Sequence, residues 1–575
     1  MNISRIFAVI LLFSVIVTTV SALSMDELRN QLSGLTSSNI NSEGINIKDL
    51  KTNQLTIQQT SEQTKQIALS EVNQKFTQSE EVPVIVWLNE GNDAKGIIKT
   101  LGKKAKVKYI YDAFQQQGFA LTINEEKLNK LLENQAVDYV AFDASIQANL
   151  AQSRPLVQAN IVETNTSYLL TGQGVGVCHL DTGVNYAHPN LAGVYAGGYD
   201  FINNDNDPMD DNGHGTATAG VIFSNHTTRR GMAPEADLLA IKVLDAAGLG
   251  SASSLIAGIN WCITNKNQYN IAAISMSLGT LSTYTPSTSP AYADPALQTA
   301  YIQNIVPVAS TGNDGMLTQI SYPGVSPYVL PVTSSYDATF TTLTSSLTNG
   351  SICTDNVNTP DMISCFANRA SFVSIVAPGA IISTTSLFGG LGNAPGGTSL
   401  AAPHVSGAIA LMKQRNSQMT VEQIRNILTA TGVPIYDTAS GVTFKRLNIL
   451  EAVRAVPFVK KTGTFYPGNV VNIEISDPMN PGNLYFALLS LGNTPGMPVP
   501  NGLTIPINPD FVFGFSIQPS PFYLNNIGGL DANGKATATL LIPNITGVET
   551  FTVHSSFITA NASLDIEAIG NSITL

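Results

Sequence analysis

The stretch Gly396-Gly397-Thr398-Ser399-Leu400-Ala401-Ala402-Pro403-His404-Val405-Ser406-Gly407 decides how the chain is organised. It joins two glycines, which allow another group to approach the backbone closely, to an apolar run that reaches Met412 and predicts a buried helix. Thr398 or Ser399 can cap that helix, which places Ser399 where free backbone N–H groups and the helix dipole favour a developing negative charge. Ser399 is therefore a candidate nucleophile.

A nucleophilic serine needs a base, and His404 is poorly placed, because five residues along a helix rotate a side chain by about 140°. Two upstream stretches offer better partners. The apolar run Val175–Leu180 predicts a strand that ends at Asp181-Thr182-Gly183, and Asn212-Gly213-His214-Gly215-Thr216 sets a histidine between glycines ahead of a helix. We expect the base to come from here.

These three blocks, in this order along the chain, resemble the catalytic blocks of the subtilisin-like serine proteases. One block alone would be a weak signal, but three in register are specific. The resemblance implies that Ser399 attacks a scissile carbonyl, that His214 takes and returns its proton, and that Asp181 orients the imidazole. It also implies a secreted endopeptidase that acts on protein or peptide substrates.

Val306-Pro307-Val308-Ala309-Ser310-Thr311-Gly312-Asn313-Asp314 resembles the family segment whose Asn side chain completes the oxyanion hole. The resemblance implies that Asn313 stabilises the tetrahedral oxyanion together with the backbone N–H of Ser399. The alternative is an ordinary turn Asn beside a glycine.

The region 153–456 alternates short apolar strands with helices, which predicts an α/β catalytic domain with a mostly parallel sheet flanked by helices. The expected strands are Val175–Leu180, Leu238–Val243, Ile271–Leu278, Ile305–Ser310, Val329–Ser334 and Val373–Ala377. Asp181 and Asn313 follow two of them, at the carboxyl edge where open α/β sheets bind ligands.

Substrate contacts follow from the same resemblance. Residues 248–250 and 277–279 match the family segments whose backbones pair with an extended peptide as added strands. The residues expected to bind substrate are Gly248, Leu249, Gly250, Ser277, Leu278, Gly279, Ser310 and Gly312. Ser321 is expected towards the floor of the specificity pocket and Asp314 near its rim.

The loop 200–211 contains five aspartates just before His214. Carboxylate oxygens at alternating loop positions suit Ca²⁺, and the loop is similar to a calcium loop in some family members. Asp200, Asp205 and Asp207 are the expected ligands of a structural calcium ion. The alternative is a solvated acidic loop.

Four cysteines are present. Cys353 and Cys365 lie in a polar stretch that looks inserted before Ser371, and in a secreted protein they are expected to form a disulfide. Cys178, on a core strand, and Cys262, on a helix, are expected to be buried hydrophobic residues instead.

Residues 1–22 predict a secretory signal peptide: Arg5, the apolar run Ile6–Val17 and the small residues Val20-Ser21-Ala22. The run is shorter than the roughly 20 residues that span a bilayer, although an N-terminal anchor is the alternative. Without the signal peptide no membrane span is expected, and the protein is expected outside the cell.

Charged residues are denser before about residue 152 than after it, which predicts a boundary there. Residues 23–80 are rich in Gln, Ser, Thr and Asn and predict a mobile leader. Residues 81–152 predict a compact α+β domain whose order of elements resembles the inhibitory propeptide of the family. The resemblance implies a zymogen whose own propeptide inhibits it and whose tail, 144–154, is cut between about Asn149 and Arg154. The alternative is an unrelated α+β domain that stays attached.

Beyond Val456 the helical patterns stop, and residues 457–575 predict a β-sandwich. Its expected strands are Val470–Ile475, Leu484–Leu491, Phe511–Ile517, Ala536–Ile542 and Thr550–Phe557. The role of this domain is left open between binding substrate, attaching to a cell surface and stabilising the chain.

At 575 residues and a net charge of −12, the chain is expected to have several domains and a soluble surface. It has no basic tract that would suit nucleic acid. Two functions of different class are compatible with the pattern: a secreted endopeptidase, or a binding protein on an inactive protease fold. The four filled catalytic positions favour the endopeptidase.

Overall fold

The computed structural model describes residues 79–142 and 153–575, with gaps at 90, 102–105, 112–116, 341, 349, 357, 395, 500–502, 519 and 546, and a few positions between 69 and 76. The chain divides into two compact units, Met1–Ile146 and Gln147–Leu575. The predicted signal peptide, most of the predicted leader and residues 143–152 of the predicted cleavage region lie outside the described residues. No helix in the described part is long and apolar enough to cross a membrane.

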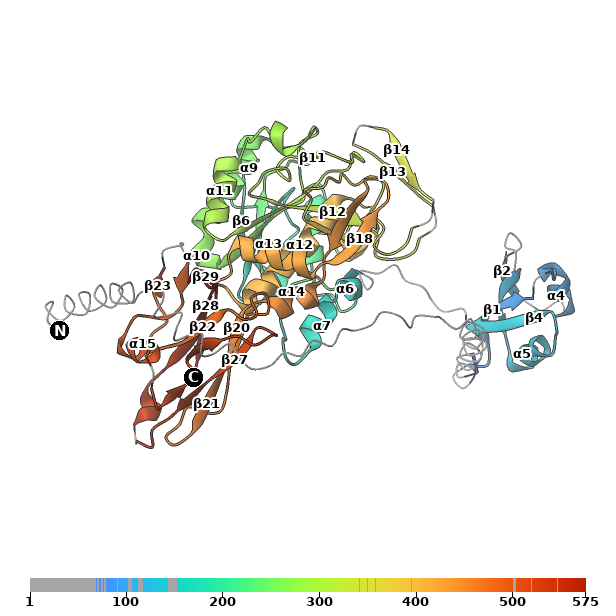
Figure 1. Cartoon of the computed structure of the whole chain (residues 1–575). Coiled ribbons are helices and arrows are strands. Elements are labelled where there is room, and N and C mark those ends of the chain that lie inside the picture. Colours follow the sequence, from blue (N-terminus) through green and yellow to red (C-terminus); the bar gives the residue numbers. More distant parts are fainter. Residues whose placement is uncertain are drawn as a thin grey trace. The chain divides into compact units, whose positions relative to one another are not determined.

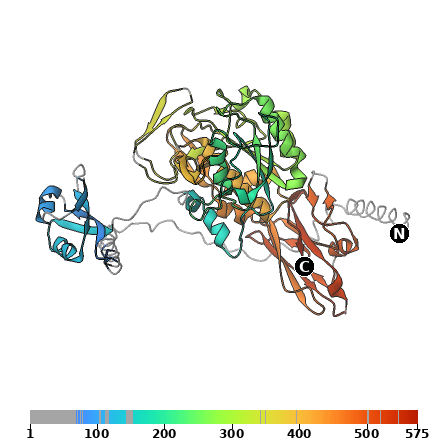
Figure 2. The same cartoon turned by 180° about the vertical axis from the view of Figure 1, so that it is seen from behind.

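The first unit is a four-stranded antiparallel sheet in the order β2-β3-β1-β4. Helices α4 and α5 share one hydrophobic cluster with Val82, Val84 and Val86 of β1, so they cover the same face of the sheet (Figures 1 and 2). The side chains of Asp93 and Asn124 cap the two helices. The elements are β1 Val82–Leu88, α4 Ala94–Thr100, β2 Lys106–Tyr111, β3 Gly118–Ile123, α5 Glu125–Leu132 and β4 Val137–Phe142.

The second unit is built on a nine-stranded sheet in the order β18-β19-β15-β12-β10-β8-β5-β7-β6 (Figure 1). All neighbouring strands are parallel except β18 and β19. The strands are β5 Gly176–Asp181, β6 Tyr195–Asp200, β7 Asp237–Lys242, β8 Ile271–Met276, β10 Val306–Ser310, β12 Leu330–Ser335, β15 Ile375–Pro378, β18 Val433–Asp437 and β19 Val442–Arg446. The predicted α/β class and parallel sheet are confirmed for this region, whereas β6, β18 and β19 were not foreseen.

Helices cover both faces of this sheet. Val177 of β5 belongs to a cluster with residues of α8 and α12, whereas its neighbours Cys178 and Leu180 belong to a cluster with residues of α9 and α11. This alternation makes β5 a fully buried central strand. The helices are α6 Ser153–Leu156, α7 Ala159–Thr164, α8 His214–Phe223, α9 Ala252–Thr264, α10 Lys266–Tyr269, α11 Asp294–Ile302, α12 Thr398–Arg415, α13 Val421–Thr431 and α14 Ile449–Ala455.

Two antiparallel sheets after residue 457 share one core, which includes Ile473 from the first sheet and Phe557 from the second. The expected strand at Phe511–Ile517 is wrong. These residues form the helix α15, Phe511–Ser516, because the side chain of Asp510 accepts hydrogen bonds from Val512 N and Phe513 N and caps it. The strands are β20 Phe458–Thr462, β21 Val470–Ser476, β25 Tyr523–Leu524 and β27 Lys535–Leu541 in one sheet and β22 Leu484–Ser490, β26 Ile527–Gly529, β28 His554–Ala560, β29 Ile566–Ile569 and β30 Ile573–Thr574 in the other.

These sheets contact the C-terminal end of α12. Asn416, buried at that end, donates hydrogen bonds of 2.8 Å to the carbonyl oxygens of Pro457 and Ile569. The guanidinium of Arg415 lies 3.8 Å from the ring centroid of Phe458. The C-terminal region is therefore joined to the helix that begins beside Ser399.

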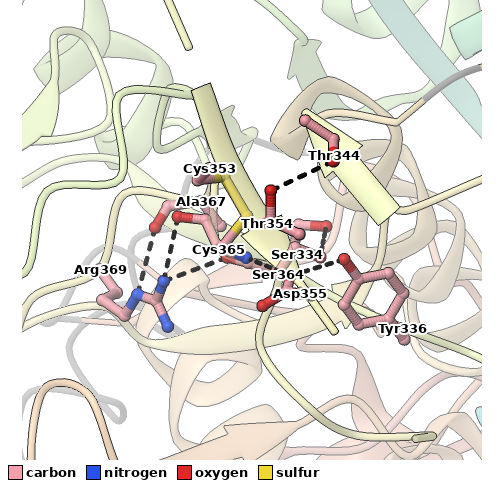
Figure 3. Close-up of a disulfide and its surroundings, with 10 residues drawn as sticks. All are labelled: Ser334, Tyr336, Thr344, Cys353, Thr354, Asp355, Ser364, Cys365, Ala367 and Arg369. Atoms are coloured by element: carbon pink, nitrogen blue, oxygen red, sulfur yellow. Dashed lines mark hydrogen bonds between the residues drawn. A yellow bond between two sulfur atoms is a disulfide. The ribbon is translucent and has the colours of Figure 1, made fainter. Parts of the chain in front are cut away.

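Both pairs of cysteines are disulfides. The predicted Cys353–Cys365 bond is present and joins the hairpin β13 Leu343–Ser346 and β14 Ile352–Asp355 to the following segment (Figure 3). The expectation that Cys178 and Cys262 are unbonded hydrophobic residues is wrong. Both are fully buried, but α9 packs on the face of β5 that carries Cys178, with 6.2 Å between the Cα atoms, and the two sulfurs are bonded.

Candidate active site

The three motif residues come from the ends of three elements. Asp181 is the last residue of β5, His214 is the first residue of α8, and Ser399 is the second residue of α12. Ser399 therefore lies in the first helical turn as expected, but the expected capping is wrong. Gly397 occupies the cap position and has no side chain that could bond the first turn, whereas Thr398 N donates to the side-chain oxygen of Asn313. The cap residue therefore does not occupy the N–H of Ser399.

Pro403 gives the carbonyl of Ser399 an unusual partner. A proline inside a helix has no N–H to donate to the carbonyl four residues earlier, which here is that of Ser399. The buried hydroxyl of Ser277 donates to this oxygen instead, at 2.7 Å. Ser277 thus fixes the backbone of the candidate nucleophile from a neighbouring strand end.

His214 and Asp181 form a short hydrogen bond, with Nδ1 of His214 2.7 Å from Oδ1 of Asp181. An Nδ1–H that donates to a carboxylate leaves Nε2 as the acceptor. Burial opposes the charge of His214, but the charge and the hydrogen bond of Asp181 outweigh it and raise the pKa of His214 above 6.5. Burial likewise opposes the charge of Asp181, and the partner histidine lowers the pKa of that carboxyl below its usual value.

Sequence reasoning missed three polar residues that hold this pair. Thr218 Oγ1 lies 3.2 Å from Oδ2 of Asp181 and closer to His214 O, at 2.9 Å, and to His179 Nε2, at 3.0 Å. Fully buried His179 lies 3.9 Å from the same carboxylate oxygen, and burial lowers its pKa. Asp210 accepts hydrogen bonds from Thr182 Oγ1 and from Thr216 N and Oγ1, which ties the start of α8 to the end of β5. The only available signal was the position of Asp210 four residues before His214.

Asn313 follows β10 in the loop that faces the start of α12. Its side-chain oxygen accepts from Thr398 N at 2.9 Å and from Thr398 Oγ1 at 3.0 Å. A Cβ on Gly397 would lie 3.4 Å from Nδ2 of Asn313, in van der Waals contact, so this nitrogen lies beside the start of α12. With the oxygen occupied, the amide N–H₂ remains the donor that a ligand can use.

A cavity of about 610 Å³ brings the predicted residues together. His214, Ser399 and Asn313 line it, as does Ser321. All eight expected substrate-binding residues line it as well: Gly248, Leu249, Gly250, Ser277, Leu278, Gly279, Ser310 and Gly312. Its walls also include Leu281 and Tyr292, both largely exposed, and Thr348, none of which the sequence indicated. Asp314, expected at the rim, is not among the lining residues, and its carboxylate accepts from Asn368 Nδ2.

The expected calcium ligands do not form a metal site as a group. Within the described ranges no three His, Cys, Asp or Glu side chains are placed to hold a metal ion. The carboxylate of Asp200 accepts hydrogen bonds from Ile202 N, Asn203 N and Asn203 Nδ2. Asp207 accepts from the Tyr186 hydroxyl at 2.7 Å, and Asp205 from Asp207 N. The carboxylates of Asp200 and Asp205 thus bond within this loop, and that of Asp207 bonds Tyr186 outside it.

Comparison with known proteins gives one consistent result. The model of the Subtilase family matches residues 172–449. The alkaline protease of Alkalihalobacillus alcalophilus is 32% identical over 378 residues, which cover 63% of this chain and 86% of that protein. Subtilisin E of Bacillus subtilis is 32% identical over 344 residues, 59% of this chain and 80% of that protein. A crystal structure of a cold-adapted subtilisin-like serine proteinase is 30% identical with a TM-score of 0.40, covering 48% of this chain and 89% of that one.

Proposed function

Because the chain belongs to the subtilase family and is a subtilisin-like serine endopeptidase, we propose that Asp181, His214 and Ser399 are its catalytic triad and that Asn313 is its oxyanion donor. The observation that carries this proposal is the 2.7 Å contact between His214 Nδ1 and Asp181 Oδ1, together with a cavity lined by His214, Ser399 and Asn313.

The proposed mechanism uses each of these atoms. Nε2 of His214 takes the proton of the Ser399 hydroxyl as its oxygen attacks the scissile carbonyl. Asp181 stabilises the imidazolium that forms, and the tetrahedral oxyanion accepts hydrogen bonds from Asn313 Nδ2 and the backbone N–H of Ser399. His214 then protonates the leaving amine, and water hydrolyses the acyl-enzyme by the same steps.

The substrate we propose is an extended polypeptide. Residues 248–250 and 277–279 both line the cavity, which supports the proposed main-chain pairing of these segments with a strand-like peptide. Small polar residues, Ser310 and Ser321, and the glycines around them suit a medium-sized or apolar side chain in the pocket. Leu281 and Tyr292 add apolar wall further along the cleft.

We also propose that the enzyme is secreted as a zymogen. Residues 1–22 have the pattern of a signal peptide, and the region 82–142 forms a compact unit of its own with a separate hydrophobic core. This unit is the proposed inhibitory propeptide, cut between about Asn149 and Arg154, and residues 457–575 are the proposed β-sandwich domain. A structural calcium ion is not part of this proposal, because the carboxylates of Asp200, Asp205 and Asp207 accept hydrogen bonds from neighbouring groups.

Covalent labelling tests the triad. A fluorophosphonate probe should label the wild-type protein at Ser399, and Ser399→Ala should abolish both labelling and casein hydrolysis. Ser406→Ala, a buried serine of the same helix whose hydroxyl bonds Ala402 O, is the matched control and should stay labelled. Equal labelling of wild type and Ser399→Ala would refute the assignment.

The zymogen proposal has its own test. The N-terminus of the secreted product should map between residues 149 and 154, and Ser399→Ala should accumulate unprocessed. Residues 24–150 added in trans should inhibit the mature enzyme, because a cleaved tethered segment becomes a product inhibitor. A mature N-terminus near Leu23 with no inhibition in trans would show that this unit is a permanent domain.

A further inference from the structure

The loop that carries Asn313 has few hydrogen bonds of its own. We call residues 311–316 the oxyanion loop. Gly312 and Gly315 both have positive φ, +95° and +68°, so the backbone turns at these two positions and forms neither helix nor strand. Its polar backbone groups must therefore find partners elsewhere.

One buried side chain supplies the partners of three of these backbone groups. Asn368 is fully buried, and its Nδ2 donates to Thr311 O at 3.0 Å and to Asp314 Oδ2 at 2.9 Å. Its Oδ1 accepts from Asp314 N at 2.9 Å and from Met316 N at 3.0 Å. A primary amide can make four such bonds, so Asn368 is fully satisfied, and all four partners lie in the oxyanion loop.

The backbone around Asn368 continues the same contact. Asn368 N donates to Gly312 O at 3.0 Å, Gly315 N donates to Phe366 O at 2.8 Å, and Arg369 N donates to Met316 O at 2.7 Å. A Cβ on Gly312 would lie 2.6 Å from Asn368 Nδ2, which only glycine avoids. The segment 366–369 therefore runs against the oxyanion loop with no room between them.

This segment is itself held by the inserted hairpin. Cys365 is bonded to Cys353 of β14, and Asp355 of the same strand accepts from Cys365 N at 2.9 Å (Figure 3). The guanidinium of Arg369 donates to the carbonyl oxygens of Ser364, Cys365 and Ala367 (Figure 3). These bonds stabilise the turn that contains Asn368. At the tip of the hairpin, Thr348 N donates to Asn313 O at 3.1 Å, and Thr348 lines the cavity with Ser399.

We propose that Asn368 is the positioning residue of the oxyanion loop and that the Cys353–Cys365 disulfide holds it in place. The inference rests on the proposed role of Asn313. Asn368 does not touch the reacting atoms, and it acts by fixing the position of Asn313 Nδ2 relative to Ser399. The hairpin β13–β14 and the segment up to Ser371 thus support catalysis, because they hold the oxyanion loop in place.

The decisive measurement is a double-mutant cycle with Asn313. Asn368→Ala should lower kcat on a chromogenic peptide by about tenfold or more, because a displacement of about 1 Å costs that much, with KM changed less than about threefold. In an Asn313→Ala background, the same Asn368→Ala change should have almost no further effect on kcat. Equal losses in both backgrounds would overturn the proposal, since they would mean that Asn368 acts on stability alone.

A second pair of variants covers the case in which Asn368→Ala folds poorly. Asn368→Asp keeps the shape but turns two donor contacts into repulsions with Thr311 O and the Asp314 carboxylate. Adding Asp314→Asn restores a donor opposite residue 368, so the double variant should recover part of the kcat that Asn368→Asp loses. No recovery would contradict the proposed contact.

Asn416→Ala is the matched control for loss of a buried Asn amide. It lies at the far end of α12, about 25 Å along the helix from Ser399 at 1.5 Å per residue. It should lower Tm without changing kcat. Cys353→Ser with Cys365→Ser should lower kcat in the same direction as Asn368→Ala, and an unchanged kcat would remove the disulfide from the proposal. Fluorophosphonate labelling of the wild type decides the proposed function separately.

Discussion

The Ser277 hydroxyl bonds the carbonyl oxygen of Ser399 because Pro403 cannot. Ser277→Ala leaves that buried carbonyl without a partner and frees the first turn of α12 to shift, so kcat should fall while KM changes little. Pro403→Ala supplies the missing N–H, and the double variant should recover part of the lost kcat. Steady-state kinetics of the three variants test this, and a Pro403→Ala change that gives no recovery would contradict it.

The activity should depend on the protonation of His214. Its pKa is raised above 6.5 by Asp181, and catalysis needs the neutral base, so kcat/KM should rise with pH through a value above 6.5. Asp181→Asn removes the charge that raises this pKa and also the acceptor that fixes the tautomer. We expect a fall of about 10⁴-fold in kcat and an acid limb at lower pH. If the acid limb of the pH profile stayed at the same pH in Asp181→Asn, Asp181 would not be the group that raises the pKa of His214.

Asp337 should make the stability of the protein fall with pH. It is nearly buried, neither carboxylate oxygen has a hydrogen-bond partner from another described residue, and burial raises its pKa to about 7. The folded state therefore holds a proton that the unfolded state releases near pH 4. The contribution of Asp337 to the free energy of unfolding should fall by on the order of 4 kcal/mol between about pH 4 and pH 7 and then level off.

Asp337→Asn removes this dependence. At pH 8 the variant should unfold at higher urea than the wild type, and at pH 4 the two should coincide. Asp361→Asn is unsuitable as a control, because it breaks the ion pair with Arg446, so Asp531→Asn in an exposed turn serves instead. If the difference in unfolding free energy between the wild type and Asp337→Asn were the same at pH 4 and at pH 8, Asp337 would not have a raised pKa.

The junction between α12 and the C-terminal sheets should contribute to stability. Arg415→Ala removes the guanidinium that covers Phe458 and contacts Tyr168, and we expect a loss of about 1–2 kcal/mol in the free energy of unfolding. Lys461→Ala, on the exposed part of β20, should change it by less than about 0.5 kcal/mol. Urea unfolding measures both variants, and equal losses in the free energy of unfolding would show that the junction does not stabilise the protein.

The loop 200–207 should be held by hydrogen bonds rather than by a metal ion at its three aspartates. Asp200→Asn should lower Tm by the same amount in excess chelator and in millimolar calcium, because its carboxylate accepts three bonds within the loop. If Asp200 bound calcium in the folded state, the wild-type Tm would rise with free calcium by mass action and the variant would lose that rise.

The motifs could be read from the sequence because each is local. Asp181, His214 and Ser399 each stand at the end of one strand or the start of one helix, and the pattern of apolar runs locates those ends. Their partners are not local. Thr218 reaches Asp181 across 37 positions and Asn368 reaches Asp314 across 54, so only the folded topology brings them together.

The disulfides and the acidic loop also show that contacts set by the folded topology could not be predicted from the sequence. Cys353 and Cys365 are 12 residues apart and could be paired from the sequence, whereas Cys178 and Cys262 are 84 apart and meet only because α9 packs on β5. The aspartates of the loop 200–211 look alike in the sequence. In the fold Asp210 holds the start of α8 and Asp200 closes its own turn.

The hydrogen bonds of Asn416 also mean that the C-terminal end of α12 is completed late in the synthesis of the chain. The amide that ends α12 bonds carbonyls that lie 41 and 153 positions further along the chain. On a ribosome that adds residues from the N-terminus, the nucleophile and its helix emerge long before the second of these acceptors. A chain released before residue 569 would carry every catalytic residue and still leave that end of the helix incomplete.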